Sequence, residues 1–334
     1  MSTSPFQDRH GRKINYLRLS ITDRCNLRCT YCGLSFRDFI PQEEVLTYEE
    51  HLQLITLARS LGVSKIRLTG GEPFARRDFL TFVSAVAKRF PDLDLRVTTN
   101  GTLIPDRVRE IEEAGLTRLN ISLDTLDRET YYRLCGKDLL PSVFRTIENA
   151  LRAGLRIKIN TVAMRGINDG ELPEFIHLAR THSLDVRFIE CMPVGNNSVA
   201  DLSGIWTAKE IVSEAKRHAQ LTPVAKSREN SGPARVFELK GGRGRLGVIS
   251  PLSQHFCASC NRFRITSDGR LRTCLFSSKE YRLKPVLRHG RLGAEQARLV
   301  MRLAAQRKPA GHQLGNGEGM EKCTCWGPMS SIGG

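Results

Sequence analysis

The sequence lacks any apolar run close to the roughly 20 residues that a membrane-spanning helix needs, so we expect no membrane partner. Its first ten residues also lack the apolar core of a secretion signal, because Phe6 is their only large apolar residue after Met1. Together, these two absences predict a cytoplasmic protein.

Also absent is the G-x-x-x-x-G-K-[ST] loop, which excludes a nucleotide site of the P-loop type. A match to G-x-G-x-x-G does occur, from Gly242 to Gly247. It lies between two short predicted strands and no helix follows it, so we interpret it as a hairpin turn and not as a dinucleotide site.

The composition is that of a folded protein with an excess of positive charge. The 334 residues are 40% hydrophobic and 26% charged, and 51 Lys and Arg against 35 Asp and Glu give a net charge of +16. The excess indicates either a solvated basic surface or an anionic partner, which could be nucleic acid or a polyphosphate. Ten cysteines in a reducing compartment predict metal binding or catalysis, not disulfides.

The first two thirds of the chain alternate between strand and helix patterns. Apolar and polar residues alternate with period two in segments 17–22, 65–69, 95–100, 119–124, 155–160 and 184–188. Helical patterns cover 48–61, 78–90, 105–114, 141–153 and 172–181. Gly62, Gly115 and Gly154 come directly after three of these helices, as C-cap glycines do. The βα alternation predicts a parallel sheet.

The predicted strands each have one apolar and one polar face, whereas parallel strands covered on both faces are continuously apolar. A barrel with helices outside and a polar interior explains this pattern. Six βα units are too few for a closed barrel of eight. We therefore predict an α/β fold, an incomplete (βα)6 TIM-like barrel over residues 1–200. A C-terminal α+β extension over residues 201–334 follows, with a helix at 207–217, strands at 235–240 and 245–250, a helix at 294–305 and a glycine-rich tail.

Three cysteines follow the first strand with C-x3-C-x2-C spacing, at Cys25, Cys29 and Cys32. Thiolates favour iron–sulfur clusters, zinc or copper(I). A structural zinc site needs four ligands, and this loop offers no fourth. A [4Fe–4S] cluster held by three cysteines would leave one iron open to another ligand.

A second group of three has C-x2-C-x13-C spacing, at Cys257, Cys260 and Cys274. The turn signal at residues 267–269 predicts a hairpin that returns Cys274 to the other two. A zinc ribbon with His255 as fourth ligand is one interpretation. A second [4Fe–4S] cluster with an open iron fits three ligands better.

The first cysteine motif, the adjoining Tyr31 and the segment Leu68-Thr-Gly-Gly-Glu-Pro73 resemble the radical S-adenosylmethionine superfamily. The resemblance implies a partial barrel of six units whose open iron binds S-adenosylmethionine. One electron from the cluster would then release a 5′-deoxyadenosyl radical. Glycines at Gly70 and Gly71 would let the backbone approach the ligand closely.

The second motif narrows the resemblance. Segments 257–264, 267–270 and 274–276, with the terminal Gly333-Gly334, are similar to the GTP 3′,8-cyclases of molybdenum cofactor biosynthesis, and 18–24, 65–73 and 187–190 also match. The family converts GTP to 3′,8-cyclo-7,8-dihydro-GTP with two [4Fe–4S] clusters and S-adenosylmethionine. It further implies an electron donor, a homodimer, transfer to the next enzyme of the pathway, and entry of the terminal glycines into the active site.

Basic residues alternate with apolar ones on the predicted strands, unlike the charges of exposed helix faces. Their side chains should converge on one cavity and suit a triphosphate, because arginine binds its oxygens in a fork. The set comprises Arg18, Arg67, Lys158, Arg187, Arg262 and Arg264. The resemblance implies that GTP contacts Arg18, Arg67, Thr98, Lys158, Arg262 and Arg264. It implies that S-adenosylmethionine contacts Tyr31, Gly71, Ser122 and Met192.

Two other functions fit parts of the pattern. A peptide-modifying radical enzyme with an auxiliary cluster fits both cysteine groups, but Arg262-x-Arg264 and the terminal glycines argue against it. A basic zinc protein that binds nucleic acid fits the charge; we expect no nucleic-acid partner.

Some residues depart from the motifs of the family or take no part in them. We expect unligated thiols at Cys135 and Cys191. The C-x-C at Cys323 and Cys325 fits either a metal pair or free tail thiols, and we expect free thiols. Gly33-Leu34 replaces the Met-Pro that often follows the third cysteine.

Overall fold

The structure is a computed structural model that describes residues 6–32, 39–193, 205–225, 232–289 and 293–312. The predictions for Gly33, Leu34, Cys323, Cys325, Gly333 and Gly334 lie outside these residues. None of the helices in the described ranges is long and apolar enough to cross a bilayer.

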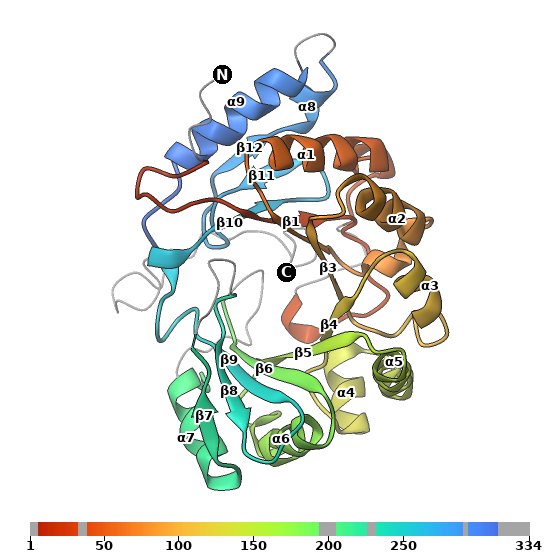
Figure 1. The fold of residues 1–334 in the computed structure, drawn as a ribbon, viewed down its shortest axis with the longest axis vertical. Helices are drawn as coiled ribbons and strands as arrows, with labels where there is room; N and C mark the ends of the chain where they lie inside the picture. The colour runs from red at the N-terminus through yellow and green to blue at the C-terminus, as the bar shows by residue number, and fades with distance from the viewer. Residues whose placement is uncertain (1–5, 33–38, 194–204, 226–231, 290–292, 313–334) are drawn as a thin grey trace.

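One sheet of twelve strands forms the frame of the molecule, in the order β12-β11-β10-β1-β2-β3-β4-β5-β6-β9-β8-β7 (Figure 1). The six strands that come first in the sequence, β1 to β6, are parallel and neighbour one another in chain order. They are β1 (Tyr16–Ser20), β2 (Lys65–Thr69), β3 (Asp94–Thr99), β4 (Arg118–Ser122), β5 (Arg156–Ala163) and β6 (Leu184–Glu190). This arrangement confirms the predicted partial barrel.

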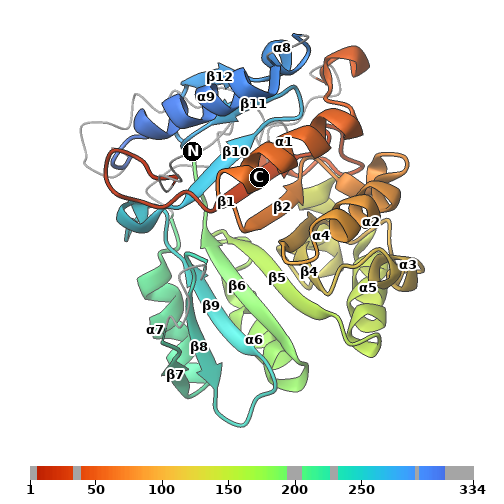
Figure 2. The same cartoon turned by 45° about the horizontal axis from the view of Figure 1, so that its top comes forward.

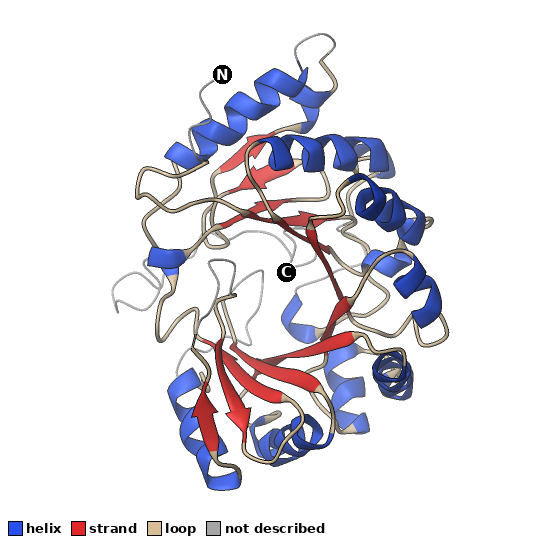
Figure 3. Ribbon diagram, viewed as in Figure 1, coloured by secondary structure: helices blue, strands red, loops and turns tan. Residues whose placement is uncertain are grey.

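Helices cover the outer face of the curved sheet (Figure 3). Five match the predicted positions: α1 (Tyr48–Ser60), α2 (Phe79–Arg89), α3 (Val108–Glu113), α5 (Leu140–Arg152) and α6 (Leu172–Thr181). Local signals set their ends. Thr47 and Glu50 form a capping box at the start of α1, and Gly62, Gly115 and Gly154 adopt positive φ after α1, α3 and α5. Helix α4 (Arg128–Cys135) was not predicted; it has only eight residues and begins six positions after the end of β4.

The C-terminal segment adds strands to both edges of this sheet. β9 (Arg245–Ile249) pairs in parallel with β6, and β10 (Arg262–Ile265) pairs in parallel with β1. Antiparallel strands extend each edge: β7 (Leu221–Pro223) and β8 (Arg235–Leu239) on one side, β11 (Arg270–Arg272) and β12 (Glu280–Arg282) on the other (Figure 2). Helices α7 (Ala208–His218), α8 (Lys284–Leu287) and α9 (Gly293–Gln306) complete the segment. The division near residue 200 stays a prediction, because both parts share one sheet.

The alternation along the strands separates core from cavity. In β5 the apolar Ile157, Ile159 and Ala163 are buried between sheet and helices, while Lys158 and Asn160 are only partly buried. Each apolar side chain buried in this way contributes roughly 1.5–3 kcal/mol. The polar side chains therefore lie on the concave face, where they can line an interior site.

Both predicted hairpins are present. The Gly242–Gly247 segment joins the antiparallel strands β8 and β9, and an added Cβ on Gly244 would lie 1.9 Å from the carbonyl oxygen of Leu184. Close backbone packing explains its glycines without a dinucleotide. The second hairpin joins β10 to β11, with Gly269 at φ 81°.

Candidate active site

The concave face of the sheet encloses a cavity of about 1370 Å³. Every residue predicted for the site within the described ranges lines its wall, and the terminal Gly333 and Gly334 lie outside those ranges. Those predicted as cluster ligands are Cys25, Cys29, Cys32, Cys257, Cys260 and Cys274; those predicted for GTP are Arg18, Arg67, Thr98, Lys158, Arg262 and Arg264; those predicted for S-adenosylmethionine are Tyr31, Gly71, Ser122 and Met192. The structure thus brings them together, and their individual roles stay predictions.

The first cysteine group lies on the loop between β1 and the short 3₁₀ turn Thr30–Cys32. The backbone N–H of Leu27 donates to Cys25 Sγ at 3.4 Å, and Asn100 Nδ2 donates to the same sulfur at 3.8 Å. On the far side of the loop, Cys29 Sγ lies 3.7 Å from Cys135 Sγ in α4. The cysteines are therefore fixed by the sheet on one side and a helix on the other.

The Gly70-Gly71-Glu72 turn after β2 packs directly on the cysteine loop. The N–H of Gly71 donates to the carbonyl of Thr22, and that of Glu72 to the carbonyl of Arg24, both at 2.8 Å. An added Cβ on Gly71 would lie 2.2 Å from the Arg24 oxygen. Only glycine fits here, so the two loops form one unit.

The Glu72 carboxylate connects this turn to the end of β3. It accepts hydrogen bonds from Thr99 Oγ1 at 2.8 Å and from the backbone N–H of Asn100 at 2.7 Å. Full burial raises the pKa of Glu72 to about 7, although these donors oppose the change. Glu72 is a structural member of the site, since its oxygens are occupied by the protein itself.

A second buried carboxylate, Asp124, positions the tyrosine between the cysteines. The Tyr31 hydroxyl donates to Asp124 Oδ2 at 2.5 Å, and the N–H of Val162 donates to Oδ1 at 2.8 Å. Burial, followed by the charge of Cys29, raises the pKa of Asp124 to about 7. Asp124 was not predicted as a site residue, although it stands two residues after Ser122 and lines the same cavity.

The thiols of the first group influence one another's pKa values. Burial raises the pKa of Cys25 to about 12. Hydrogen bonds from Cys135 and Cys32 hold the pKa of Cys29 well below its usual range, and the same bond holds the pKa of Cys32 well above it. Three adjacent thiolates repel one another, so a cationic centre is needed to ionise all of them.

The second group lies at the opposite edge of the cavity, around the hairpin that begins with β10. Burial acts to raise the pKa of Cys260, but the nearby Lys308 ammonium and Arg262 bring it down to about 7. Lys308 Nζ donates to the carbonyl oxygen of Arg262 at 3.0 Å and also to that of Thr273, which precedes Cys274. The surroundings of Cys260 therefore favour its thiolate, the form that binds metal.

A single zinc ion fits the described residues poorly. Zinc requires four ligands at about 2.0–2.3 Å from one point, and no three His, Cys, Asp or Glu within the described ranges converge in that way. His255 is exposed; its ring packs edge-on against His312 and its Nδ1 lies 3.4 Å from the Pro251 oxygen. Three separated cysteines suit a cluster, in which each thiolate binds a different iron.

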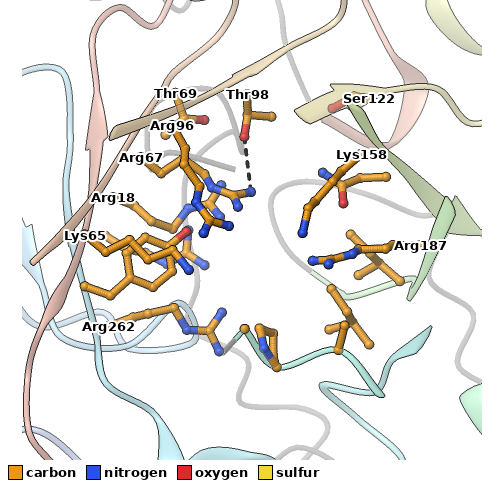
Figure 4. A pocket seen from close by; sticks show the side chains of 18 of the residues that line it. Arg18, Lys65, Arg67, Thr69, Arg96, Thr98, Ser122, Lys158, Arg187 and Arg262 are labelled. Atoms are coloured by element: carbon orange, nitrogen blue, oxygen red, sulfur yellow. Dashed lines mark hydrogen bonds between the residues drawn. The ribbon is translucent and has the colours of Figure 1, made fainter. Parts of the chain in front are cut away.

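Between the cysteine groups, four arginines stand side by side on adjacent strands. Arg264 of β10 neighbours Arg18 of β1, which neighbours Arg67 of β2, which neighbours Arg96 of β3. Figure 4 shows Arg18, Arg67 and Arg96 directed into the cavity with Lys65 and Arg262 nearby. Burial lowers the pKa of Arg67, and that of Arg264 to about 10. Like charges this close repel, so the row favours an anion.

The opposite wall carries cations that share one carboxylate. Asp185 Oδ2 lies 3.3 Å from Lys158 Nζ and 3.2 Å from Arg187 Nη2, and Asp185 Oδ1 lies 2.9 Å from Arg245 Nε. Burial lowers the pKa of Lys158 to about 7, and Arg187 adds to the effect. Asp185 and Lys65 were not predicted as site residues. Each stands two residues from a predicted cation on the same strand, Asp185 from Arg187 and Lys65 from Arg67.

Two arginine nitrogens on these walls are buried without a hydrogen-bond partner in the described part of the chain, Arg67 Nε and Arg187 Nε. Arg67 Nη1 donates to Thr98 Oγ1 at 3.4 Å, a long contact (Figure 4). Buried donors are almost always satisfied in proteins. Their state here indicates that an acceptor-rich ligand completes the site.

Family models match most of the chain. Residues 19–179 match the radical S-adenosylmethionine superfamily, and residues 184–314 match Molybdenum Cofactor Synthesis C. Curated proteins named GTP 3′,8-cyclase are similar over nearly the full length. That of Syntrophomonas wolfei is 42% identical, covering 94% of this chain and 96% of its own. That of Thermodesulfovibrio yellowstonii is 40% identical, covering 98% and 100%.

Solved structures share the fold at much lower sequence identity. Streptococcus suis SuiB bound to the precursor peptide SuiA gives a TM-score of 0.62 at 15% identity, covering 86% of this chain and 68% of its own. SuiB bound to S-adenosylmethionine gives 0.61 at 16%, covering 86% and 69%. These matches confirm the partial barrel.

The close packing of Gly71 on the cysteine loop can be tested by mutation. Gly71→Ala should force the loop away from the turn, because the added methyl group would overlap the Arg24 carbonyl. We expect a marked loss of iron from the first cysteine group after anaerobic reconstitution, measured as iron and sulfide per chain. The matched control is Gly232→Ala, another cavity-lining glycine with nothing within 4 Å of an added Cβ. Equal iron contents in the two variants would contradict the packing role of Gly71.

Proposed function

The chain belongs to the GTP 3′,8-cyclase family of the radical S-adenosylmethionine superfamily, and we propose that it converts GTP to 3′,8-cyclo-7,8-dihydro-GTP in molybdenum cofactor biosynthesis. The observation that carries the proposal is one cavity lined by two groups of three cysteines and by the arginine row between them. The direct test is anaerobic reconstitution with GTP, S-adenosylmethionine and a reductant, followed by identification of the product.

We assign the first [4Fe–4S] cluster to Cys25, Cys29 and Cys32, with S-adenosylmethionine at its open iron. S-adenosylmethionine and the cluster bound there would supply a 5′-deoxyadenosyl radical by one-electron cleavage of the C–S bond. Around it, the Gly71 turn offers close backbone approach, and Asp124 holds the Tyr31 ring beside the cysteines. Ser122 and Met192 complete the proposed S-adenosylmethionine contacts from the ends of β4 and β6.

We assign a second [4Fe–4S] cluster to Cys257, Cys260 and Cys274, with the guanine of GTP at its open iron. The arginines next to this group would hold the phosphates, because charge-assisted bonds from guanidinium groups satisfy both partners. This arrangement directs the ribose toward the first cysteine group across the cavity. The proposed GTP contacts are Arg18, Arg67, Thr98, Lys158, Arg262 and Arg264.

Several finer statements belong to this proposal. The barrel at 1–200 and the extension at 201–334 would each contribute one cluster. An electron donor, a homodimer, the next enzyme of the pathway and a cytoplasmic location follow from the family resemblance and from the sequence pattern. The alternative of a zinc protein that binds nucleic acid is wrong, since the chain belongs to a radical enzyme family. A peptide-modifying activity has no support beyond the shared fold.

The two cysteine groups should be separable by mutation. Cys29→Ser should abolish formation of 5′-deoxyadenosine, because the cluster that cleaves S-adenosylmethionine loses a ligand. Cys260→Ala should instead abolish GTP cyclisation while some cleavage persists. Cys191→Ser, a cavity-lining cysteine outside both groups, is the control and should retain full iron and both activities. Full cyclisation by Cys260→Ala would refute the substrate role of the second group.

The arginine row should recognise phosphate. Arg67→Ala and Arg262→Ala each remove a charge-assisted bond, so GTP affinity should fall about ten- to a hundredfold, or roughly 1.5–3 kcal/mol. Guanosine affinity should fall less, because it has no phosphates. Calorimetric titration measures both ligands, and the 91% exposed Arg109→Ala is the control. Equal losses for GTP and guanosine would show that these arginines do not contact phosphate.

GTP binding should take up protons. Burial lowers the pKa of Lys158 to about 7 and that of Lys65 to about 8. A neighbouring triphosphate stabilises the ammonium form and raises both values, so affinity should decrease as the pH rises from about 7 to 9. Calorimetry in buffers of different ionisation enthalpy measures the uptake, and Lys158→Met should reduce it. Proton release on binding would contradict this prediction.

A further inference from the structure

A buried lysine stands behind the second cysteine group. Lys308 follows the C-terminal end of α9 and is only 2% exposed. Its Nζ donates to the carbonyl of Arg262, two residues after Cys260, and to the carbonyl of Thr273, immediately before Cys274. Lys308 therefore joins the two backbone segments that carry these cysteines.

The charge of Lys308 lacks a carboxylate partner. In the described part of the chain no Asp or Glu lies within ion-pair distance of its Nζ, and both of its acceptors are neutral carbonyls. A buried ammonium is costly unless an anion compensates it. The two carbonyls that hold its Nζ stand within two residues of Cys260 and Cys274, the ligands that would carry negative charge there. The compensating anion is thus the cysteine site itself.

A neighbouring cation, Arg12, makes the contrast clear. Its guanidinium pairs with the Asp8 carboxylate at 2.5 Å, so its charge is compensated within the protein. It donates to the carbonyl oxygens of Cys257 at 2.7 Å and Ala310 at 2.8 Å. Arg12 therefore holds the chain after Lys308 against the second site, and Lys308 alone of the two supplies uncompensated charge.

The first cysteine group has opposite surroundings. Two buried carboxylates lie beside it: Asp124 accepts from the hydroxyl of Tyr31, which precedes Cys32, and Glu72 accepts from the N–H of Asn100, whose side chain donates to Cys25. Positive charge near an iron–sulfur cluster favours its reduced, more negative state, and negative charge disfavours it. The two sites are thus placed in unlike electrostatic fields.

We propose that Lys308 is the positioning residue and counter-ion of the second iron–sulfur cluster: its ammonium holds the two cysteine-bearing segments together and raises the reduction potential of that cluster. The inference rests on the proposed function only in taking a cluster to be bound at Cys257, Cys260 and Cys274. It assigns no contact between Lys308 and GTP. The charge of the side chain, beyond its hydrogen bonds, is what the cluster requires.

The test uses the full chain with Cys25, Cys29 and Cys32 changed to alanine, so that only the second cluster contributes. Lys308→Gln keeps hydrogen-bond donors without charge, Lys308→Met removes both, and Lys308→Arg keeps the charge. A matched control is Lys284→Met, another buried lysine, which instead pairs with Glu44 at 2.7 Å. Reconstituted iron content and the midpoint potential, from titration followed by electron paramagnetic resonance, are measured without GTP.

The Gln and Met variants should lower the midpoint potential by the equivalent of at least a tenfold change in the reduction equilibrium, about 59 mV for one electron. The Arg variant and the Lys284 control should stay near the parent. If Gln and Met prevent cluster assembly while Arg and the control allow it, the charge requirement is also supported. A parent-like potential in the Gln variant, or loss of the cluster in the Arg variant, would overturn the inference. Absence of any cluster in the parent would remove the proposed cofactor as well.

Discussion

Repulsion between like charges that lie partly buried on one face of the sheet is the constraint on which the site depends. The parallel register places four arginines next to one another on the concave face of the sheet: Arg264, Arg18, Arg67 and Arg96. A sheet gains nothing from such a row, since like charges directly opposite destabilise pairing. The surrounding apolar layer supplies the stability, and within the protein Asp94 pairs with Arg96 at 2.6 Å. An anion bound in the cavity would recover part of the cost of the row.

The same principle separates the two cysteine groups. Carboxylates and other thiols surround the first, whereas Lys308 and Arg262 surround the second. A carboxylate near a cluster makes it a stronger reductant, and a cation makes it a better acceptor or binding site. If both groups hold clusters as proposed, ligand sets of the same chemistry would perform different tasks on one sheet. The charges behind the cysteines would then distinguish them, and not the cysteines themselves.

How far the sequence predicts this structure depends on the range of each signal. Period-two alternation identified all strands of the barrel and the inward cations, because side-chain direction on a strand is strictly local. Cysteine spacing identified both groups because the members of each lie close together in the sequence, on one loop or around one hairpin. Helix α4 was missed because its eight residues give few turns of periodicity. Lys308 was missed because nothing near it in sequence marks it; its partners, Arg262 and Thr273, meet it only through tertiary packing.

Strand pairing explains why the second cysteine group faces the first at all. β10 adds to the barrel in parallel with β1, and this pairing places Arg264 beside Arg18. Cys260 immediately precedes β10 and Cys274 closely follows β11, so the hairpin that carries them is positioned by the same hydrogen bonds. β9 extends the opposite edge beside β6. The C-terminal segment therefore completes the wall of the cavity from both sides. A barrel cut at residue 200 would lose the second cysteine group and Arg264, one of the two arginines beside Arg18.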